Sequence, residues 1–275
     1  MMRSNAYTLT RSTPHAIIDS TKLQGVWQSI ARLRAHDPTF RQVVLTDLYL
    51  GYQEARELAV VLAGNRYVTR LDLSCNKIGP SGVQCLAPAL ASMKMLFDLD
   101  LSDNELGDQG TFELVSQLKG HFCLHRLNLS RNFIGSAGAR ALSDMIAQDS
   151  PLDTFIASNN RIGGDGALAL AEALAKNEHL CSLDLSKNEI DSPAAAAFAA
   201  AVGNRGKHSL VILDLSDNRI DDGGALMLVE ATAINPWFSY LNLGGNRIGR
   251  EGFENIAAWL DQNKEVCLVL ELGRG

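Results

Sequence analysis

The chain has 275 residues, of which 46% are hydrophobic, and its formal net charge at pH 7 is −6. This composition is typical of a folded globular protein and not of a disordered one. The acidic balance argues against binding of nucleic acid by phosphate neutralisation, and no apolar stretch approaches the roughly 20 residues of a membrane span. The five cysteines form no CxxC pair and fit reduced thiols in a reducing compartment.

The first 18 residues carry two arginines, several hydroxyl side chains and no acid. Two interpretations stay open, an ordinary polar tail and a mitochondrial targeting sequence, and the tail is the simpler one. From Thr21 to Arg34, apolar side chains recur at the spacing of one helix face. They are Leu23, Val26, Trp27 and Ile30. We therefore predict that residues 1–39 form a tail and a capping helix.

Between residues 40 and 265 a phrase of the form L-x-L-x-x-N-x-I-G recurs, and its asparagines are 28, 28, 28, 28, 30 and 28 residues apart. They are Asn76, Asn104, Asn132, Asn160, Asn188, Asn218 and Asn246. The first half of each copy alternates apolar and polar residues, as a strand does, and the second half has the spacing of an amphipathic helix. A degenerate first copy, with Leu48 in place of asparagine, brings the number of repeats to about eight.

The recurring asparagine follows each expected strand, where the chain turns inward and leaves backbone groups without partners. A buried amide can satisfy such groups in its own and the adjacent repeat, so we expect the seven side chains to form a structural ladder. Glycines such as Gly135 and Gly138 are expected to permit the tight strand-to-helix turn. In the sixth repeat, Ser192 and Pro193 suggest a helix cap and a helix start instead. Residues 266–275 are predicted to form a C-terminal capping strand.

One strand and one helix cannot bury their apolar faces alone, whereas stacked copies can. We therefore predict an α/β solenoid of the horseshoe type, with a parallel sheet on the concave side and helices on the convex side. The 28-residue repeat with S-x-N-x-I-G-x-x-G and an alanine-rich helix resembles the ribonuclease-inhibitor-like class of leucine-rich repeats. Members include NOD-like receptor repeat domains, Ran GTPase-activating protein, tropomodulin and flagellar repeat proteins. The resemblance covers about residues 40–265 and implies binding of proteins on the concave sheet.

Two motifs contain residue types that occur in metal-binding or phosphate-binding sites. His121, Cys123 and His125 alternate along the chain and are ligand types that zinc accepts, but no second cluster supplies further ligands. We expect a helix-to-strand loop with two exposed histidines there, and no metal site. The segment 203–209 lacks the spacing of a phosphate-binding loop and is interpreted as a two-residue insertion. No catalytic residue and no cofactor is therefore expected.

The residues that flank the buried strand leucines should line the concave face. Near the C-terminal end, Ile212 and Tyr240 fall in one column of adjacent strands, and Asp184, Asp214 and Asp217 border them. Apolar anchors ringed by charges are typical of binding sites, so we predict that these five residues bind a basic segment of a partner protein. The alternative is that Tyr240 simply stacks on Ile212 as a cross-strand pair.

Farther toward the N-terminus, Asp98 has Arg70 and Arg126 as column neighbours, and Asp103 has Arg131. Neighbouring strands bring such pairs within reach of each other, so these acids are expected to be neutralised inside the sheet.

The sequence thus predicts a non-catalytic protein-binding scaffold or adaptor, a subunit of a larger complex such as a cytoskeletal or flagellar assembly. The second hypothesis is a regulator of a partner enzyme, either an inhibitor or a GTPase-activating factor. Both involve a protein partner, without nucleic acid or membrane. A cytoplasmic or cytoskeletal location is expected, with a mitochondrial one open from the N-terminal composition.

Overall fold

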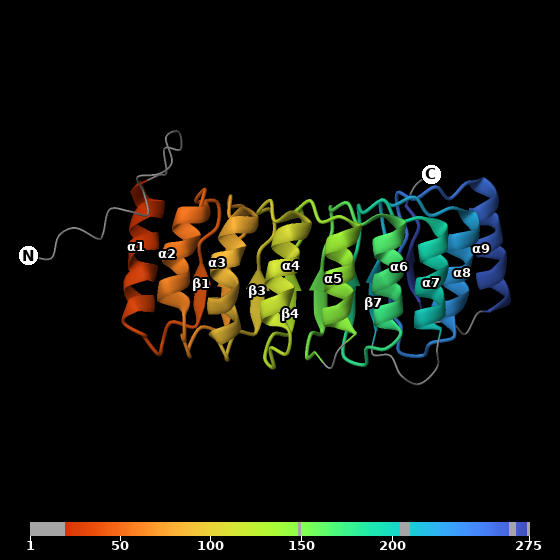
Figure 1. Cartoon of the computed structure of the whole chain (residues 1–275). Coiled ribbons are helices and arrows are strands. Elements are labelled where there is room, and N and C mark those ends of the chain that lie inside the picture. The colour runs from red at the N-terminus through yellow and green to blue at the C-terminus, as the bar shows by residue number, and fades with distance from the viewer. Residues whose placement is uncertain (1–19, 148–149, 204–209, 264–267, 274–275) are drawn as a thin grey trace, which may run out of the picture. The chain divides into compact units, whose positions relative to one another are not determined.

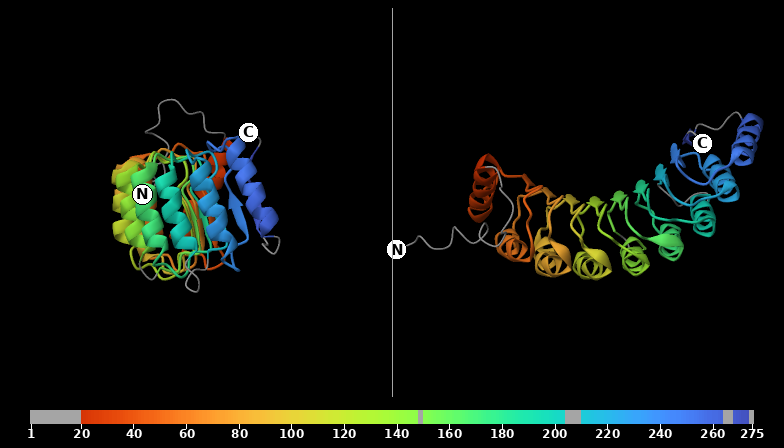
Figure 2. Two further views of the ribbon diagram at one scale, coloured as in Figure 1. Left: turned by 90° about the vertical axis from the view of Figure 1, so that its right-hand side faces the viewer. Right: turned by 90° about the horizontal axis from the view of Figure 1, so that it is seen from above.

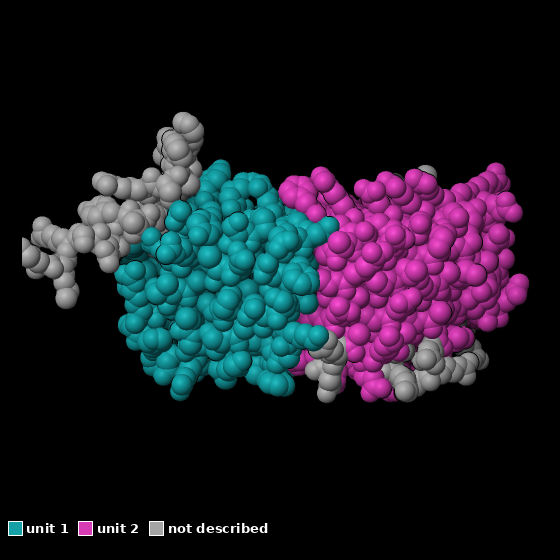
Figure 3. Space-filling model, in the orientation of Figure 1, with its two compact units in different colours: residues 1–132 teal, residues 133–275 magenta. Residues whose placement is uncertain are grey.

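The computed structural model describes residues 20–147, 150–203, 210–263 and 268–273. The chain forms two compact units, residues 1–132 and residues 133–275 (Figure 3). In the described part of each unit, short strands alternate with helices (Figure 1). Unit 1 contains α1 (Ser20–Arg34), β1 (Gln42–Val44), α2 (Tyr52–Leu62), β2 (Arg70–Asp72), α3 (Gly79–Ser92), β3 (Asp98–Asp100), α4 (Gly107–Leu118) and β4 (Arg126–Asn128).

Unit 2 repeats the same alternation from its first helix to a last short strand. It contains α5 (Ser136–Ile146), β5 (Thr154–Ile156), α6 (Gly163–Leu174), β6 (Ser182–Asp184), α7 (Ser192–Val202), β7 (Ile212–Asp214), α8 (Asp222–Ala233), β8 (Tyr240–Asn242), α9 (Arg250–Gln262) and β9 (Val269–Glu271). Each unit is therefore an α/β solenoid in which one strand and one helix make up a repeat, as the sequence predicts.

The strands of each unit pair in parallel and in sequence order, β1 to β4 in unit 1 and β5 to β9 in unit 2. Equivalent residues of successive repeats are partners, so that Leu71 stands opposite Leu99 and Leu99 opposite Leu127. These leucines are completely buried, while the residues on either side of them are at least partly exposed. Within each unit the helices lie on one side of the sheet (Figure 2). We call the side without helices the open face.

The asparagine after each strand serves two repeats at once. In unit 1, Asn132 Nδ2 donates to the carbonyls of Leu101, Leu129 and Ser130 at 2.9, 3.1 and 3.1 Å. Its Oδ1 accepts the backbone N–H groups of Asn104 and Leu106 at 3.0 and 3.3 Å. The side chain is completely buried. One amide therefore bonds to five backbone groups of two successive repeats, and the Ser130 carbonyl accepts the Asp103 N–H at 2.8 Å as well.

The ladder is weaker toward the ends of the chain. In the first repeat Leu48 is buried at the asparagine position, and its own N–H donates to Asn76 Oδ1 at 3.0 Å. In the last repeat Asn246 donates to the carbonyls of Leu215 and Leu243 at 2.8 and 2.9 Å but is only half-buried. A repeat at the end of the chain needs fewer hydrogen bonds from a ladder side chain, because it has only one neighbouring repeat or because water reaches its turn.

A second polar ladder lies in the loops between a helix and the next strand, and the repeat phrase did not predict it. Asn65 Oδ1 accepts the N–H groups of residues 67 and 68, both at 2.9 Å. In unit 2, Asn177 accepts two N–H groups in the same way and donates to the Ile146 carbonyl at 2.7 Å. His121 takes this position in unit 1, where its Nε2 donates to the Met93 carbonyl at 3.1 Å.

Two expectations about the strand-to-helix turn were wrong. The side chain that caps α7 is Asp191, which accepts the Ala194 N–H at 3.3 Å, and not Ser192. Gly135 and Gly138 do not have a positive φ, whereas Gly163, at the equivalent turn, has a φ of 65°. At Gly166, which is equivalent to Gly138, an added Cβ would lie 2.9 Å from Ala139 Cβ. A glycine inside the helix therefore allows neighbouring helices to approach closely.

The helix α1 covers the first repeat through Ile30 and Leu33, which are 3% and 1% exposed. At the other end β9 pairs with β8, in a register that places Leu270 opposite Leu241. Residues 1–19, which include the possible targeting sequence, lie outside the described residues. In the part of the chain that the structure describes, no helix has both the length and the apolar character needed to cross a membrane.

We predict that Asn132→Leu lowers the free energy of unfolding by about 1–3 kcal/mol, because buried backbone groups lose their partner. Chemical denaturation measures the change. Asn246→Leu is the matched control and should cost less, since water reaches that half-buried position. A loss of only a few tenths of a kcal/mol for Asn132→Leu would mean that the ladder is not a source of stability.

Deletion of residues 1–18 should leave the melting temperature unchanged, because that segment has no repeat pattern. Deletion of residues 1–39 should lower it clearly, since it removes Ile30 and Leu33 and exposes the edge of β1. Thermal melts of both variants test this, and equal melting temperatures would contradict a capping role for α1.

Candidate functional site

The open face of unit 2 carries an apolar row on its last strands. Ile212 of β7 is the partner of Tyr240 on β8, which is in turn the partner of Val269 on β9. Ile212 is 39% exposed, Val269 is 59% exposed and Tyr240 is half-buried. Three apolar side chains therefore lie side by side on the open face.

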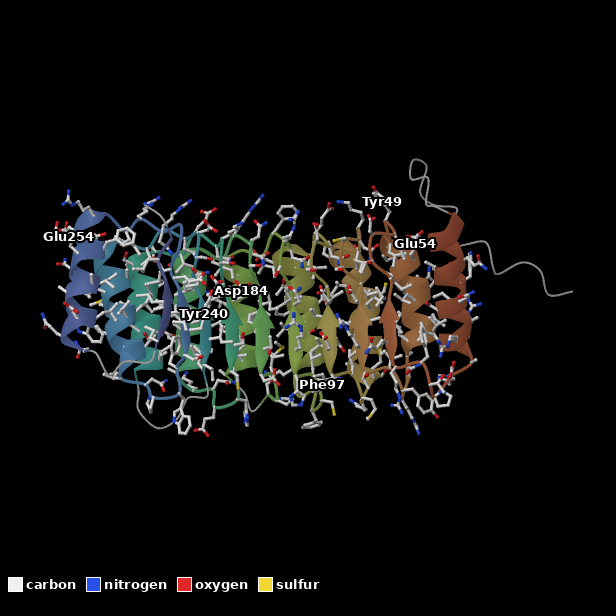
Figure 4. All side chains as sticks on the ribbon, turned by 180° about the vertical axis from the view of Figure 1, so that it is seen from behind. Tyr49, Glu54, Phe97, Asp184, Tyr240 and Glu254 are labelled. Carbon is white, nitrogen blue, oxygen red and sulfur yellow. The ribbon has the colours of Figure 1, made fainter. Side chains whose placement is uncertain are left out.

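A row of polar side chains runs parallel to the apolar row, two residues farther along each strand. Asp184, Asp214, Asn242 and Glu271 are successive partners in it. Tyr240 and Asp184 are both visible over the strands in Figure 4. Asp217 follows β7, and its carboxylate lies 3.8 Å from Lys187 Nζ. We call these residues the acidic strand surface: Asp184, Ile212, Asp214, Asp217, Tyr240, Val269 and Glu271.

The aspartates of this surface also hold the turn that follows their strand. Asp184 Oδ1 accepts the N–H and the hydroxyl of Ser186 at 2.9 and 2.7 Å. Asp214 makes the same pair of bonds to Ser216 at 2.9 and 2.6 Å. Its Oδ2 accepts Asn242 Nδ2 at 3.0 Å. One carboxylate oxygen of each residue is thus structural, and the second oxygen of Asp184 has no hydrogen-bond partner among the described residues.

The negative charge of this surface is only partly neutralised by neighbouring cations. It has four carboxylates, on Asp184, Asp214, Asp217 and Glu271, and Lys187 is the one ammonium among the described residues that faces them on the strands. Burial raises the pKa of Asp184, and the neighbouring charge of Asp214 raises it further, against the hydrogen bonds from Ser186. Burial also raises the pKa of Tyr240, together with the hydrogen bond of its hydroxyl to Glu271. A cation placed over this surface would relieve these unfavourable charges.

The five residues predicted from the sequence lie on or directly after three neighbouring strands. Val269 and Glu271 complete the surface and were missed. Their strand lies within the capping strand predicted at residues 266–275, but it carries no ladder asparagine, so its residues were not aligned with the columns of the repeats. The alternative of a simple Tyr240–Ile212 cross-strand pair agrees with the same register, in which these two residues are partners.

The open face of unit 1 pairs its charges differently. Asp98 lies between two arginines, with Arg70 Nε and Arg126 Nε at 3.5 and 3.6 Å from its carboxylate oxygens. Asp103 is 3.3 Å from Arg131 Nε. These ion pairs are the ones expected from the column positions. Unit 1 has an equivalent pair of carboxylates, Asp72 and Asp100, but the residue beside them in its sheet is the arginine-paired Asp98 instead of an apolar side chain.

The expectation of two exposed histidines was wrong. His121 is 6% exposed and belongs to the second polar ladder. Burial lowers the pKa of this imidazole. His125 is half-buried, and its ring stacks on Phe97 with centroids 4.6 Å apart. No group of three or more metal-ligand side chains occurs among the residues that the structure describes. Residues 204–209 of the insertion lie outside them.

Comparison with known proteins identifies the repeat. The family model described as "Leucine Rich repeat" matches residues 64–87, 93–115, 120–143, 156–171, 176–199, 206–229 and 235–257. The chain belongs to the leucine-rich repeat family. The matched segments make up more than half of the chain, and each ends inside a helix of the solenoid. The leucine-rich repeat assignment explains the architecture of both units, and the family's repeats are typical of protein-binding scaffolds.

Individual relatives match less of the chain. A segment of 52 residues is 44% identical to the Ran GTPase-activating protein of Drosophila melanogaster, which is 19% of this leucine-rich repeat chain and 9% of the relative. Among solved structures, leiomodin-1 actin-binding site 2 matches 57% of this chain and 77% of its own, at 18% identity and a TM-score of 0.40. The first similarity is local, and the second carries no argument about function.

We predict that Asp184→Asn raises the melting temperature at pH 7. The folded-state pKa of Asp184 lies above the unfolded value, so its ionised form destabilises the fold above the folded pKa, and the penalty disappears as pH falls toward the unfolded value. The gain should therefore fade as the pH is lowered from 7 toward 4. Asparagine keeps the turn, because Asn128 makes the same bonds to Ser130. Thermal melts across that pH range measure the effect.

Asp184→Ala is the control for the turn itself. It also removes the charge but loses the acceptor of the Ser186 bonds, so its melting temperature should lie below that of Asp184→Asn at every pH. A gain for Asp184→Asn that did not depend on pH would contradict the electrostatic origin.

Proposed function

We propose that the protein is a non-catalytic scaffold or adaptor that holds a basic segment of a partner protein on its acidic strand surface. The observation that carries the proposal is the apolar row of Ile212, Tyr240 and Val269 beside four carboxylates with one opposing ammonium. Apolar anchors would supply most of the binding energy, and the carboxylates would orient and select a cationic partner.

The electrostatics of Asp184 support this proposal. An asparagine would hold the same turn, as Asn128 does, without a buried charge. Asp184 instead keeps an ionisable carboxylate in a partly buried place where ionisation is unfavourable. Groups held in such unfavourable states are concentrated at functional sites. A lysine or arginine of a partner, placed against the free Asp184 oxygen, would make the charge favourable.

The wider setting of the proposal is a larger complex of the cytoplasm or cytoskeleton, including a flagellar assembly. A second candidate is a regulator of a partner enzyme, such as an inhibitor or a GTPase-activating factor. The local similarity to a Ran GTPase-activating protein supports this second candidate function. A scaffold would co-purify stoichiometrically with its complex and leave partner turnover unchanged, whereas a regulator would change that turnover.

The test begins with affinity purification of the whole chain from its own cells and quantitative mass spectrometry of what it retains. The retained protein is then purified and titrated calorimetrically against the chain and its variants. Tyr240→Ala should weaken binding by about 2 kcal/mol or more, with little change in melting temperature. Asp184→Asn and Asp214→Asn should weaken binding as well, and their effects should shrink at high salt.

Val44→Ala is the matched control, because Val44 is an exposed apolar residue of a strand in unit 1 and does not belong to the acidic strand surface. It should leave the affinity unchanged. If Tyr240→Ala leaves the affinity unchanged and lowers the melting temperature, the tyrosine is a structural member of the sheet. The partner would then bind elsewhere.

A further inference from the structure

The edge of unit 1 at which the strands begin is strongly basic. It consists of the helix-to-strand loops and the first residue of each strand, within residues 35–42, 63–70, 93–98 and 119–126. Its Lys and Arg residues, which we call the basic edge, are Arg41, Arg66, Arg70, Lys94, Lys119 and Arg126. Its acids are Asp37 and Asp98. Six cations therefore face two carboxylates.

Both carboxylates are already engaged. Asp37 pairs with Arg32 of α1 at 2.7 Å, and Asp98 is shared by Arg70 and Arg126. The other four cations of the basic edge are exposed, and none of them has a carboxylate partner among the described residues. Lys94 Nζ donates only to the Ala91 carbonyl, at 2.8 Å. Positive charge thus accumulates along this edge without local neutralisation.

An apolar pocket opens in the middle of the basic edge. It has a volume of about 400 Å³, and its lining includes Met95, Phe97, Cys123 and His125. Met95 is 46% exposed and Phe97 is 50% exposed, and Phe97 is visible at the edge of the sheet in Figure 4. Arg70 and its ion-pair partner Asp98 line the same pocket. An apolar side chain that entered the pocket would therefore place its flanking residues beside an arginine.

A general need of the fold does not explain these cations. Basic residues near helix C-termini complement the helix dipole, and helices of unit 2 end at the equivalent edge as well. Over the whole sequence, the equivalent segments of unit 2 hold four Lys or Arg residues and as many acids, whereas the basic edge has six and two. The four cations are Lys176, Arg205, Lys207 and Lys264, and the four acids are Asp149, Asp153, Glu178 and Glu265. The basic character therefore belongs to unit 1 in particular.

From this combination of unneutralised cations and an open apolar pocket, we infer that the basic edge docks an acidic segment of a partner protein. One large apolar side chain of the segment enters the pocket between Met95 and Phe97. Its acidic neighbours pair with Arg66 and Lys94, which have no carboxylate partner among the described residues. The charge is opposite to that of the acidic strand surface, so the two surfaces select different segments and the two proposals stand independently.

A protein segment fits this edge better than a nucleic acid. Exposed aromatic and basic side chains also occur in single-strand binders, where bases stack on the rings. Here, however, the strands that start at the edge continue into Asp72 and Asp100, whose carboxylates would repel a phosphate backbone. The net charge of −6 acts in the same direction. A short acidic segment needs to touch the edge only.

The experiment selects random dodecapeptides displayed on phage against the immobilised whole chain. The expected consensus has one large apolar residue flanked by Asp and Glu. A fluorescein-labelled consensus peptide is then titrated by anisotropy. Phe97→Ala should weaken its binding about tenfold or more, and the pair Arg66→Gln with Lys94→Gln should weaken it and reduce its salt dependence. Met95→Ser probes the other wall of the pocket should Phe97→Ala unfold, as judged by circular dichroism.

Trp237→Ala is the matched control. Trp237 is 73% exposed and stands in unit 2 at the repeat position that Met95 takes in unit 1, so its loss should change the affinity less than twofold. The inference is overturned if no acidic consensus emerges or if the pocket variants bind the peptide as the unaltered chain does. It is also overturned if an oligouridylate displaces the peptide at the peptide's own concentration range, since the edge would then be a nucleic-acid site.

Discussion

The fold depends on hydrogen-bond partners for the backbone groups at the turn between each strand and its helix. The turn buries N–H and C=O groups that no strand or helix bond can reach, and such groups cost free energy if they are left alone. The amide of Asn132 supplies three donor contacts and two acceptor contacts there, some to its own repeat and some to the preceding one. Each repeat is therefore completed by the asparagine of the next repeat, which couples neighbours to each other.

Side chains also satisfy buried backbone groups at the opposite edge of the repeat, but more than one residue type does so there. Asn65, Asn177 and Asn235 accept N–H groups of the loop that leads into the next strand, and His121 takes the place of asparagine in one repeat. With polar groups fixed along both edges, the three-residue strands can remain short. The open face is then free to carry side chains that play no part in the core, and this freedom permits a patch of partly neutralised carboxylates.

The fold could be predicted from the sequence because the residues that determine it are local and recur from repeat to repeat. The 28-residue spacing identified the strands, the helices and the seven ladder asparagines. Features that occur in a single repeat could not be predicted from the sequence. His121 looked exposed because the partner of its ring is a carbonyl in another repeat, and Asp191 replaced the expected cap because both residues suit that role. Phe97 and the basic edge lie in loops, where no periodic pattern reveals which side chains gather.

The turn that follows β2, β3, β4, β6 and β7 allows the charge of the open face to change without loss of the bonds that hold the turn. Asp72, Asp100, Asp184 and Asp214 accept an N–H and a hydroxyl from the serine two residues on, and Asn128 does the same with its amide oxygen. An exchange of Asp for Asn changes the face by one charge and leaves both bonds in place. Paralogues that share one core can therefore diverge in partner choice through single-atom differences at these positions, without renewed optimisation of their packing.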